Sequence, residues 1–124
     1  KKKLRNSSSV VFTASISGYN NVAPANGIYG TSKSALSTYM KYAALELAGK
    51  GIRCNAVQPG RINTPLISNR LLSEEDVTKD IEQYPMKRYG KPEEVAHAII
   101  YLLSDASAWV TGTNLVIDGG RSLK

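Results

Sequence analysis

The chain has 124 residues, a net charge of +6 and an apolar fraction of 42%, enough for one packed core but not for several domains. No apolar run approaches the roughly 20 residues of a membrane span, and no stretch of signal-peptide length follows the charged start. Four of the positive charges fall in the first five residues, and no basic stripe interleaved with aromatics appears elsewhere, so nucleic-acid binding is disfavoured. The single cysteine, Cys54, excludes an internal disulfide and fits a reducing compartment, so we expect an inert core thiol and a cytoplasmic protein.

The first half of the chain predicts a strand, a loop and a long helix. Residues 9–15 contain a short continuous apolar run, typical of a strand buried on both faces of a parallel sheet. Residues 20–27 are rich in Asn, Pro, Ala and Gly and predict a loop. Apolar side chains then recur at helical spacing over residues 28–48, and Gly49 and Gly51 follow as stop signals.

The second half predicts two more strands separated by a polar excursion and a helix. Residues 52–57 form a strand that Pro-Gly ends, and the mixed segment 61–83 follows with a short helix near 73–83. A long excursion directly after a ligand-side strand end is a typical place for a mobile substrate lid. A helix opens at Pro92, and residues 115–117 form the last strand. The order strand, helix, strand, lid, helix, strand predicts an α/β fold with a parallel sheet.

Several side chains receive a simpler structural interpretation. We expect Trp109 to anchor a turn by burial, and His97, which has no partner at metal-ligand spacing, to be a structural or surface residue. The buried face of the helix from Pro92 should comprise Val95, Ala96, Ile99, Ile100, Leu102 and Leu103. Some apolar residues of the excursion either pack it onto the body or line a substrate pocket, and the sequence leaves both open; they are Leu66, Ile67, Leu71, Leu72, Tyr84 and Met86.

Tyr29 and Lys33 lie four residues apart at the start of the first predicted helix, in the sequence Y-G-T-S-K. Positions i and i+4 share a helix face, so the phenol and the ammonium can point into the same pocket. A fixed positive charge near a phenol favours the phenolate, and such a tyrosine can give or take a proton during catalysis. On these five residues alone, an ordinary tyrosine and a solvated lysine would be the commoner explanation.

Three further segments of the sequence favour a catalytic role for Tyr29 and Lys33. They are S-I-S-G from Ser15, N-A-V-Q-P-G-R-I-N-T from Asn55 and V-T-G-T-N-L-V-I-D-G-G from Val110. Together with Y-G-T-S-K, and in the same order, they resemble the C-terminal half of a short-chain dehydrogenase/reductase of the classical subfamily. The resemblance covers residues 9–120. It implies the C-terminal half of a Rossmann-type doubly wound parallel sheet, βαβαβ with a lid excursion.

The resemblance also implies catalytic roles. Tyr29 would protonate a carbonyl oxygen during reduction, or take the proton of an alcohol during oxidation. Lys33 would favour the phenolate of Tyr29 and hold the ribose hydroxyls of a nicotinamide cofactor. Ser15 would donate a hydrogen bond to the carbonyl oxygen. The substrate is then a small alcohol or carbonyl compound, and the hydride comes from NAD or NADP.

By the same resemblance, four residues after the second strand would line the nicotinamide: Pro59, Gly60, Ile62 and Thr64. Ile62 would offer backbone groups to the carboxamide. The physical basis is that Pro-Gly makes a tight turn and lets a flat ring approach the backbone closely.

Two departures from the family pattern matter. The gap from Ser15 to Tyr29 is fourteen residues, one more than usual; Ser17 lies nearer to Tyr29 but past the strand end, so Ser15 is preferred. The glycine-rich turn, the N-A-G strand and the helix asparagine of the family, which hold the adenosine and pyrophosphate or complete the catalytic group, are absent from this sequence. We therefore expect residues 1–124 to be the catalytic and substrate half of one NAD(P)-binding domain, with the nucleotide-binding half outside this chain.

A second interpretation stays open beside the enzyme. The chain could be a catalytically inactive half that serves as a binding or assembly module, with helices 28–48 and 92–104 packed against partner copies. Retention of Ser15, Tyr29 and Lys33 favours the enzyme, because an assembly module has no need of them. A homodimer or homotetramer is expected from the resemblance only.

Overall fold

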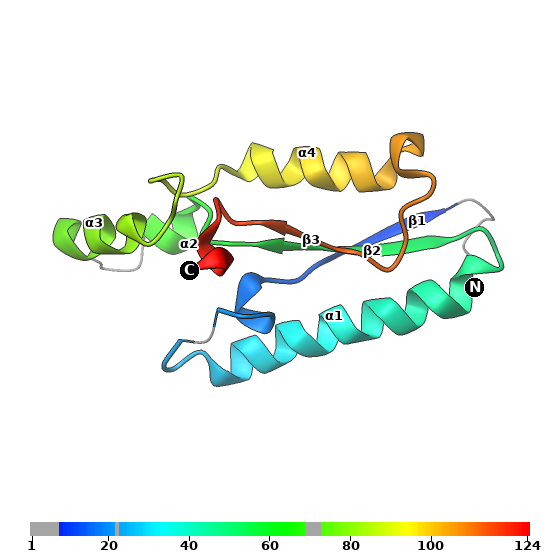
Figure 1. Cartoon of the computed structure of the whole chain (residues 1–124), viewed down its shortest axis with the longest axis horizontal. Coiled ribbons are helices and arrows are strands. Elements are labelled where there is room, and N and C mark those ends of the chain that lie inside the picture. Colours follow the sequence, from blue (N-terminus) through cyan, green and yellow to red (C-terminus); the bar gives the residue numbers. More distant parts are fainter. Residues whose placement is uncertain (1–7, 22, 69–72) are drawn as a thin grey trace.

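The computed structural model describes residues 8–21, 23–68 and 73–124, and all structural statements concern these residues. Their elements alternate between strands and helices, as the sequence predicts (Figure 1). In chain order they are β1 (Ser9–Thr13), η1 (Ile16–Gly18), α1 (Gly27–Ala48), β2 (Arg53–Pro59), α2 (Pro65–Ser68), α3 (Glu74–Glu82), α4 (Pro92–Leu103), η2 (Asp105–Ser107), β3 (Asn114–Ile117) and η3 (Arg121–Leu123). Within this described part of the chain, every helix is too short or too polar to cross a bilayer.

The three strands form one parallel sheet in the order β1-β2-β3. Val11 is paired with Asn55 and Val57 with Leu115, so β2 is the central strand. Helix α1 covers one face of the sheet and α4 the other (Figure 1). The predicted βαβαβ order with an excursion after β2 is confirmed. Because the strands are parallel, their carboxyl ends meet at a single edge, where α1 begins.

The main core lies between α1 and the sheet. Met40, Ala43 and Ala44 of α1 pack against Cys54 and Ala56 of β2, and all five are buried. The small alanines let the helix axis approach the sheet closely. Complete burial of Met40 alone contributes about 1.5–3 kcal/mol.

Strand β1 is less buried than we expected. Val10, Val11 and Phe12 are half-buried, whereas the central residues of β2 are almost fully buried. The outer edge of β1 pairs with no strand among the described residues, and this explains the difference. The expectation that residues 9–15 form a strand buried on both faces is therefore wrong for β1, and β2 is the buried strand of the sheet.

Helix α4 also buries fewer side chains than its pattern predicts. Leu102 is fully buried, but Ile100 and Leu103 remain 62% and 48% exposed.

Arg53 of β2 holds the end of this helix, because its guanidinium donates to the carbonyl oxygens of Leu102 (2.9 Å) and Ser104 (3.0 Å). A cation at the last carbonyls of a helix satisfies acceptors that have no partner within the helix.

The expectation for Trp109 is wrong, because its side chain is fully exposed. The turn is instead held by Ser107, which is 1% exposed. Its hydroxyl donates to the carbonyl of Leu102 (3.0 Å) and accepts from Arg53 (2.9 Å). Buried hydrogen bonds of Ser107 therefore hold this turn, and the side chain of Trp109 does not. His97 is a surface residue, and the described residues form no cluster of metal ligands.

Candidate active site

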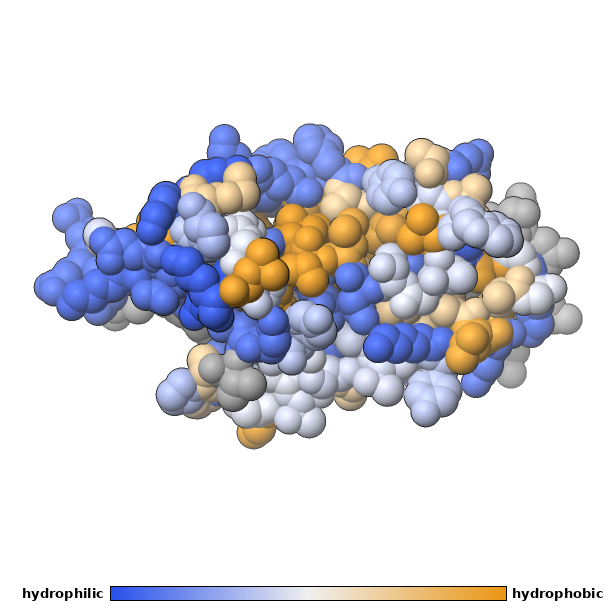
Figure 2. Space-filling model, in the orientation of Figure 1, coloured by the Kyte–Doolittle hydropathy of each residue, from blue (hydrophilic) through white to orange (hydrophobic). Residues whose placement is uncertain are grey.

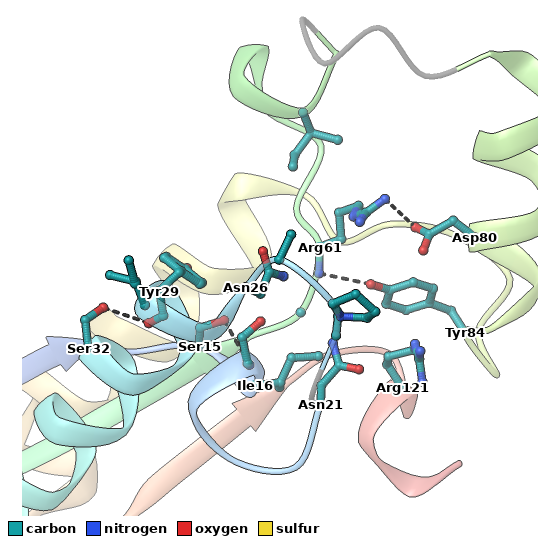
Figure 3. A pocket seen from close by; sticks show the side chains of 17 residues that line it. Ser15, Ile16, Asn21, Asn26, Tyr29, Ser32, Arg61, Asp80, Tyr84 and Arg121 are labelled. Carbon is teal, nitrogen blue, oxygen red and sulfur yellow. Dashed lines mark hydrogen bonds and ion pairs between the residues drawn. The ribbon is translucent and has the colours of Figure 1, made fainter.

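A cleft of about 930 Å³ opens at the carboxyl edge of the sheet (Figure 3). One side is built by η1, the loop after it and the first turns of α1. The other is built by residues 60–61 after β2, by α2, by α3 with the segment that follows it, and by η3. Ser15, Tyr29 and Gly60, which are three of the predicted site residues, line this cleft.

Ser15 lies two residues beyond β1 and is the N-cap of η1. It is 8% exposed, and its Oγ accepts a hydrogen bond from the backbone N–H of Ser17 at 3.2 Å. A hydroxyl that accepts from the backbone keeps its own proton for a second partner. The serine can therefore donate into the cleft from a fixed position. Ser17 also lines the cleft, but it lies inside η1.

Tyr29 and Lys33 lie on the first two turns of α1, on one face of the helix. The ammonium of Lys33 lies 5.6 Å from the centre of the Tyr29 ring and donates to the carbonyl oxygen of Thr13 at 3.0 Å. Lys33 thus contacts the phenol ring from the side of β1 and does not itself line the cleft. Tyr29 does line it and remains 48% exposed.

The distance between η1 and α1 is set by two glycines. A Cβ on Gly18 would lie 2.5 Å from the backbone nitrogen of Ser34, and one on Gly30 would lie 2.8 Å from the carbonyl oxygen of Ser17. Ser34 adds a hydrogen bond from its Oγ to the carbonyl oxygen of Gly18 at 2.6 Å. This contact holds the loop that carries Ser15 against the helix that carries Tyr29.

The four residues predicted to line a nicotinamide occupy the end of β2 and the chain just after it. Gly60 lines the cleft, and its amide donates to the carbonyl of Ile117 at 2.9 Å. Ile62 forms an isolated parallel bridge with Gly90, through the carbonyl of Arg61 and the amide of Asn63. The N–H and C=O of Ile62 itself therefore point away from that bridge. Pro59 ends β2 and Thr64 precedes α2, and neither is among the residues that line the cleft.

A polar cluster on the opposite side of the cleft was missed by the sequence analysis. Arg61 forms an ion pair with Asp80 at 2.8 Å, and Tyr89 donates to the same carboxylate oxygen at 2.7 Å. The hydroxyl of Tyr84 accepts from the backbone N–H of Arg61 at 3.3 Å. These contacts attach α3 to the end of β2. The sequence carried a weak signal for them, since Arg61 directly follows the Pro-Gly that ends a ligand-side strand.

Some of the excursion's apolar residues line the cleft, as one of the two interpretations expects. Ile67 and Tyr84 line the cleft, whereas Met86 is 61% exposed. Leu71 and Leu72 lie outside the described residues, as does the side chain of Leu66. The predicted helix near 73–83 is confirmed as α3, with Ser73 as its N-cap. The excursion therefore supplies part of the wall of the cleft.

The sequence and the structure of the chain were compared with those of known proteins. The profile of a family described as Enoyl-(Acyl carrier protein) reductase matches residues 1–122. The chain is 42% identical to a cyclohexanol dehydrogenase of Acinetobacter over 115 residues, which are 93% of this chain and 43% of that protein. It is 42% identical to a 3-oxoacyl-(acyl-carrier-protein) reductase of Thermotoga maritima over 118 residues, 95% of this chain and 46% of that protein.

Solved structures of similar proteins superpose well on the chain. A short-chain type dehydrogenase/reductase from Mycobacterium ulcerans superposes with a TM-score of 0.90 at 36% identity, over 96% of this chain and 43% of that one. A 3-oxoacyl-(acyl-carrier protein) reductase from Brucella melitensis gives a TM-score of 0.86 at 34% identity, over 94% of this chain and 42% of that one. The chain thus spans less than half the length of these relatives. On these matches it belongs to the short-chain dehydrogenase/reductase family.

Proposed function

We propose that the protein is an NAD(P)-dependent oxidoreductase that interconverts an alcohol and a carbonyl compound. Residues 1–124 are then the catalytic and substrate half of a single NAD(P)-binding domain. The observation that carries the proposal is that Ser15 and Tyr29 line one cleft while the ammonium of Lys33 lies against the Tyr29 ring. Three groups for proton transfer and carbonyl polarisation thus gather at the edge where open α/β sheets bind ligands.

In the proposed reaction the Tyr29 hydroxyl gives its proton to the carbonyl oxygen during reduction and takes it back from the alcohol during oxidation. Ser15 donates a hydrogen bond to the same oxygen, because its Oγ only accepts from the N–H of Ser17 and its own proton is not used there. The positive charge of Lys33 stabilises the phenolate that remains on Tyr29 after proton transfer. Because Ser15 is buried and fixed as an N-cap, it needs little reorganisation when charge develops on the oxygen.

The residues present fit a nicotinamide cofactor, which supplies or accepts the hydride when bound. Lys33 uses one of its three N–H donors on the Thr13 carbonyl and keeps two for ribose hydroxyls. Gly60 lines the cleft without a side chain, and Ile62 keeps a backbone donor and acceptor for a carboxamide. Pro59 and Thr64 would complete this wall. These observations support either NAD or NADP.

The proposal is tested with Tyr29→Phe in the full-length protein. We expect turnover to be abolished while NADH binding, followed by cofactor fluorescence, stays nearly unchanged, because only the proton donor is removed. Tyr39→Phe is the matched control, since Tyr39 is an exposed tyrosine on the same helix whose ring contacts Phe12. Undiminished turnover in Tyr29→Phe would remove the proton-transfer role.

A second candidate function, a catalytically inactive binding or assembly module, is favoured by exposed apolar side chains. Ile28 and Leu45 on α1 are 92% and 81% exposed, and Trp109 is fully exposed. Figure 2 shows a further apolar area in the middle of one face, along β3 and α4. Such surfaces also fit a homodimer or homotetramer of a cytoplasmic enzyme. Absence of NADH binding in the full-length protein would favour the module.

A further inference from the structure

The side of the cleft that faces Tyr29 carries charged groups that proton transfer does not use. Figure 3 shows Arg61, Asp80, Tyr84 and Arg121 toward one side of the cleft and Tyr29 toward the other. The described residues that line the cleft include two guanidinium groups, those of Arg61 and Arg121, and one carboxylate, that of Asp80. The cleft therefore has a net positive wall opposite the proposed proton donor.

The positive charge of Arg61 is balanced by the carboxylate of Asp80. Its guanidinium forms the 2.8 Å ion pair with Asp80, and Tyr89 donates to the same carboxylate oxygen. The guanidinium carbon of Arg61 also lies over the Tyr89 ring, 5.7 Å from its centre. Both side chains of the ion pair are less than one-third exposed. Arg61 thus serves chiefly to attach α3 to the end of β2, and the unbalanced positive charge belongs to Arg121.

The guanidinium of Arg121 has no hydrogen bond or ion pair with any residue that the structure describes. Its nearest acidic neighbour in sequence, Asp118, is occupied, because its two carboxylate oxygens accept from the amides of Gly120 (2.9 Å) and Ser122 (2.7 Å). The backbone of this segment is fixed on its other side by Asn20, whose amide donates to the Ser122 carbonyl at 2.7 Å. Arg121 therefore extends from a fixed backbone segment, and its guanidinium has no partner among the residues that the structure describes.

Tyr84 adds a second donor beside it. This residue is 4% exposed, and its hydroxyl accepts from the backbone N–H of Arg61, so its own proton is free for a ligand. Burial raises the pKa of the Tyr84 phenol, so it remains a neutral donor at physiological pH. A guanidinium fork and a fixed hydroxyl donor together match an acceptor group that carries a negative charge.

We propose that this wall, centred on Arg121 with Tyr84 beside it, binds a carboxylate on the substrate, so that the substrate is a hydroxy acid or the corresponding oxo acid. The inference rests on the proposed function, since the reacting hydroxyl or carbonyl is placed at Tyr29 and the carboxylate at the opposite wall. Arg121 is then a residue that determines specificity and orients the substrate, and it takes no part in proton transfer.

The test compares ligands that differ in charge and by one methyl group. Saturated 2-, 3- and 4-hydroxy acids and their methyl esters are titrated into the full-length protein with NADH or NADPH present, and binding is followed calorimetrically. We expect at least one acid to bind about 10- to 100-fold more tightly than its ester, the range for a charge-assisted hydrogen bond to a guanidinium. In Arg121→Gln this preference should disappear while binding of the ester is unchanged. Lys124→Gln is the matched control, because it removes an equal charge three residues away at a side chain that does not line the cleft.

The outcomes separate this inference from the proposed function. Equal binding of acid and ester across the series overturns the carboxylate site, and so does an acid preference that survives in Arg121→Gln. An acid preference that Arg121→Gln abolishes supports the site even if no ligand is turned over, since binding is read without chemistry. Turnover is then measured separately. Failure to oxidise any acid, ester or neutral secondary alcohol with NAD or NADP would refute the oxidoreductase and leave the binding result standing.

Discussion

Replacing Gly18 by alanine should separate the two segments that carry the candidate catalytic groups. The added Cβ would lie 2.5 Å from the backbone nitrogen of Ser34 and 2.6 Å from the backbone carbonyl carbon of Lys33. Both neighbours are main-chain atoms, so neither can rotate away as a flexible side chain would. Either η1 or α1 has to shift, and the loop that holds Ser15 would move relative to Tyr29.

The expected magnitude follows from two opposing terms. Overpacking of this kind costs about 1–3 kcal/mol, and a glycine-to-alanine change in a compatible conformation returns about 0.4–1 kcal/mol through the unfolded chain. Gly18 does not have a positive φ, so no backbone strain is added. The net loss should be about 1–2 kcal/mol in the free energy of unfolding. A displacement near 1 Å at the site can lower kcat/KM about 100-fold.

Gly27→Ala is the matched control for this experiment. Gly27 begins α1, and a Cβ there meets nothing within 4 Å. The same chemical change should therefore be neutral or stabilise by up to about 1 kcal/mol, with kcat/KM unchanged. Urea unfolding of the full-length protein gives the free energies, and steady-state kinetics give the second readout. Equal stability and activity of the two variants would refute the view that Gly18 sets the spacing between Ser15 and Tyr29.

Two further predictions concern single ionisable groups. Hydrogen bonds from Arg88 (2.6 and 2.8 Å) and from the Lys91 amide (2.7 Å) lower the pKa of Glu94 to about 2. Because the folded pKa lies below the unfolded value of about 4.3, this stabilisation should be complete above that value and be lost as the pH falls through about 2. Urea unfolding of wild type and Glu94→Gln should converge over that window, and a pH-independent difference contradicts the assignment. Burial raises the pKa of the fully buried Cys54 thiol, so a thiol reagent should label it only after denaturant is added, and rapid labelling of native protein would contradict this.

The sequence predicted well those features that depend on local patterns. Helix α3 was expected near residues 73–83 and begins at Glu74, with the Ser73 hydroxyl accepting from the Asp76 amide at 3.1 Å. The i,i+4 placement of Tyr29 and Lys33 on one helix face also follows from sequence alone. Both rest on backbone geometry within a few residues, which neighbouring elements alter little.

The far wall of the cleft could not be predicted in the same way. Arg61 and Asp80 are nineteen residues apart, and Arg121 comes from the last turn of the chain, so only the folded arrangement brings them to one cavity. Tyr84 was grouped with apolar residues, because its hydroxyl accepts from a backbone amide. A side-chain pattern in the sequence cannot indicate a hydrogen bond to the backbone. The roles of such residues depend on contacts between elements rather than on spacing.

The wrong burial predictions share one physical origin. Periodicity identifies the face of an element that is apolar, but it does not identify what covers that face. Ile100, Leu103 and Trp109 are apolar and exposed, and Phe12 on the outer strand is only half-buried. In the larger domain that we propose, β1 would gain a neighbouring strand on its open edge, and exposed residues of α1 and α4 could face partner copies. The apolar pattern would then describe surfaces of the whole assembly, whereas Ser15, Tyr29 and Arg121 line one cleft among the described residues.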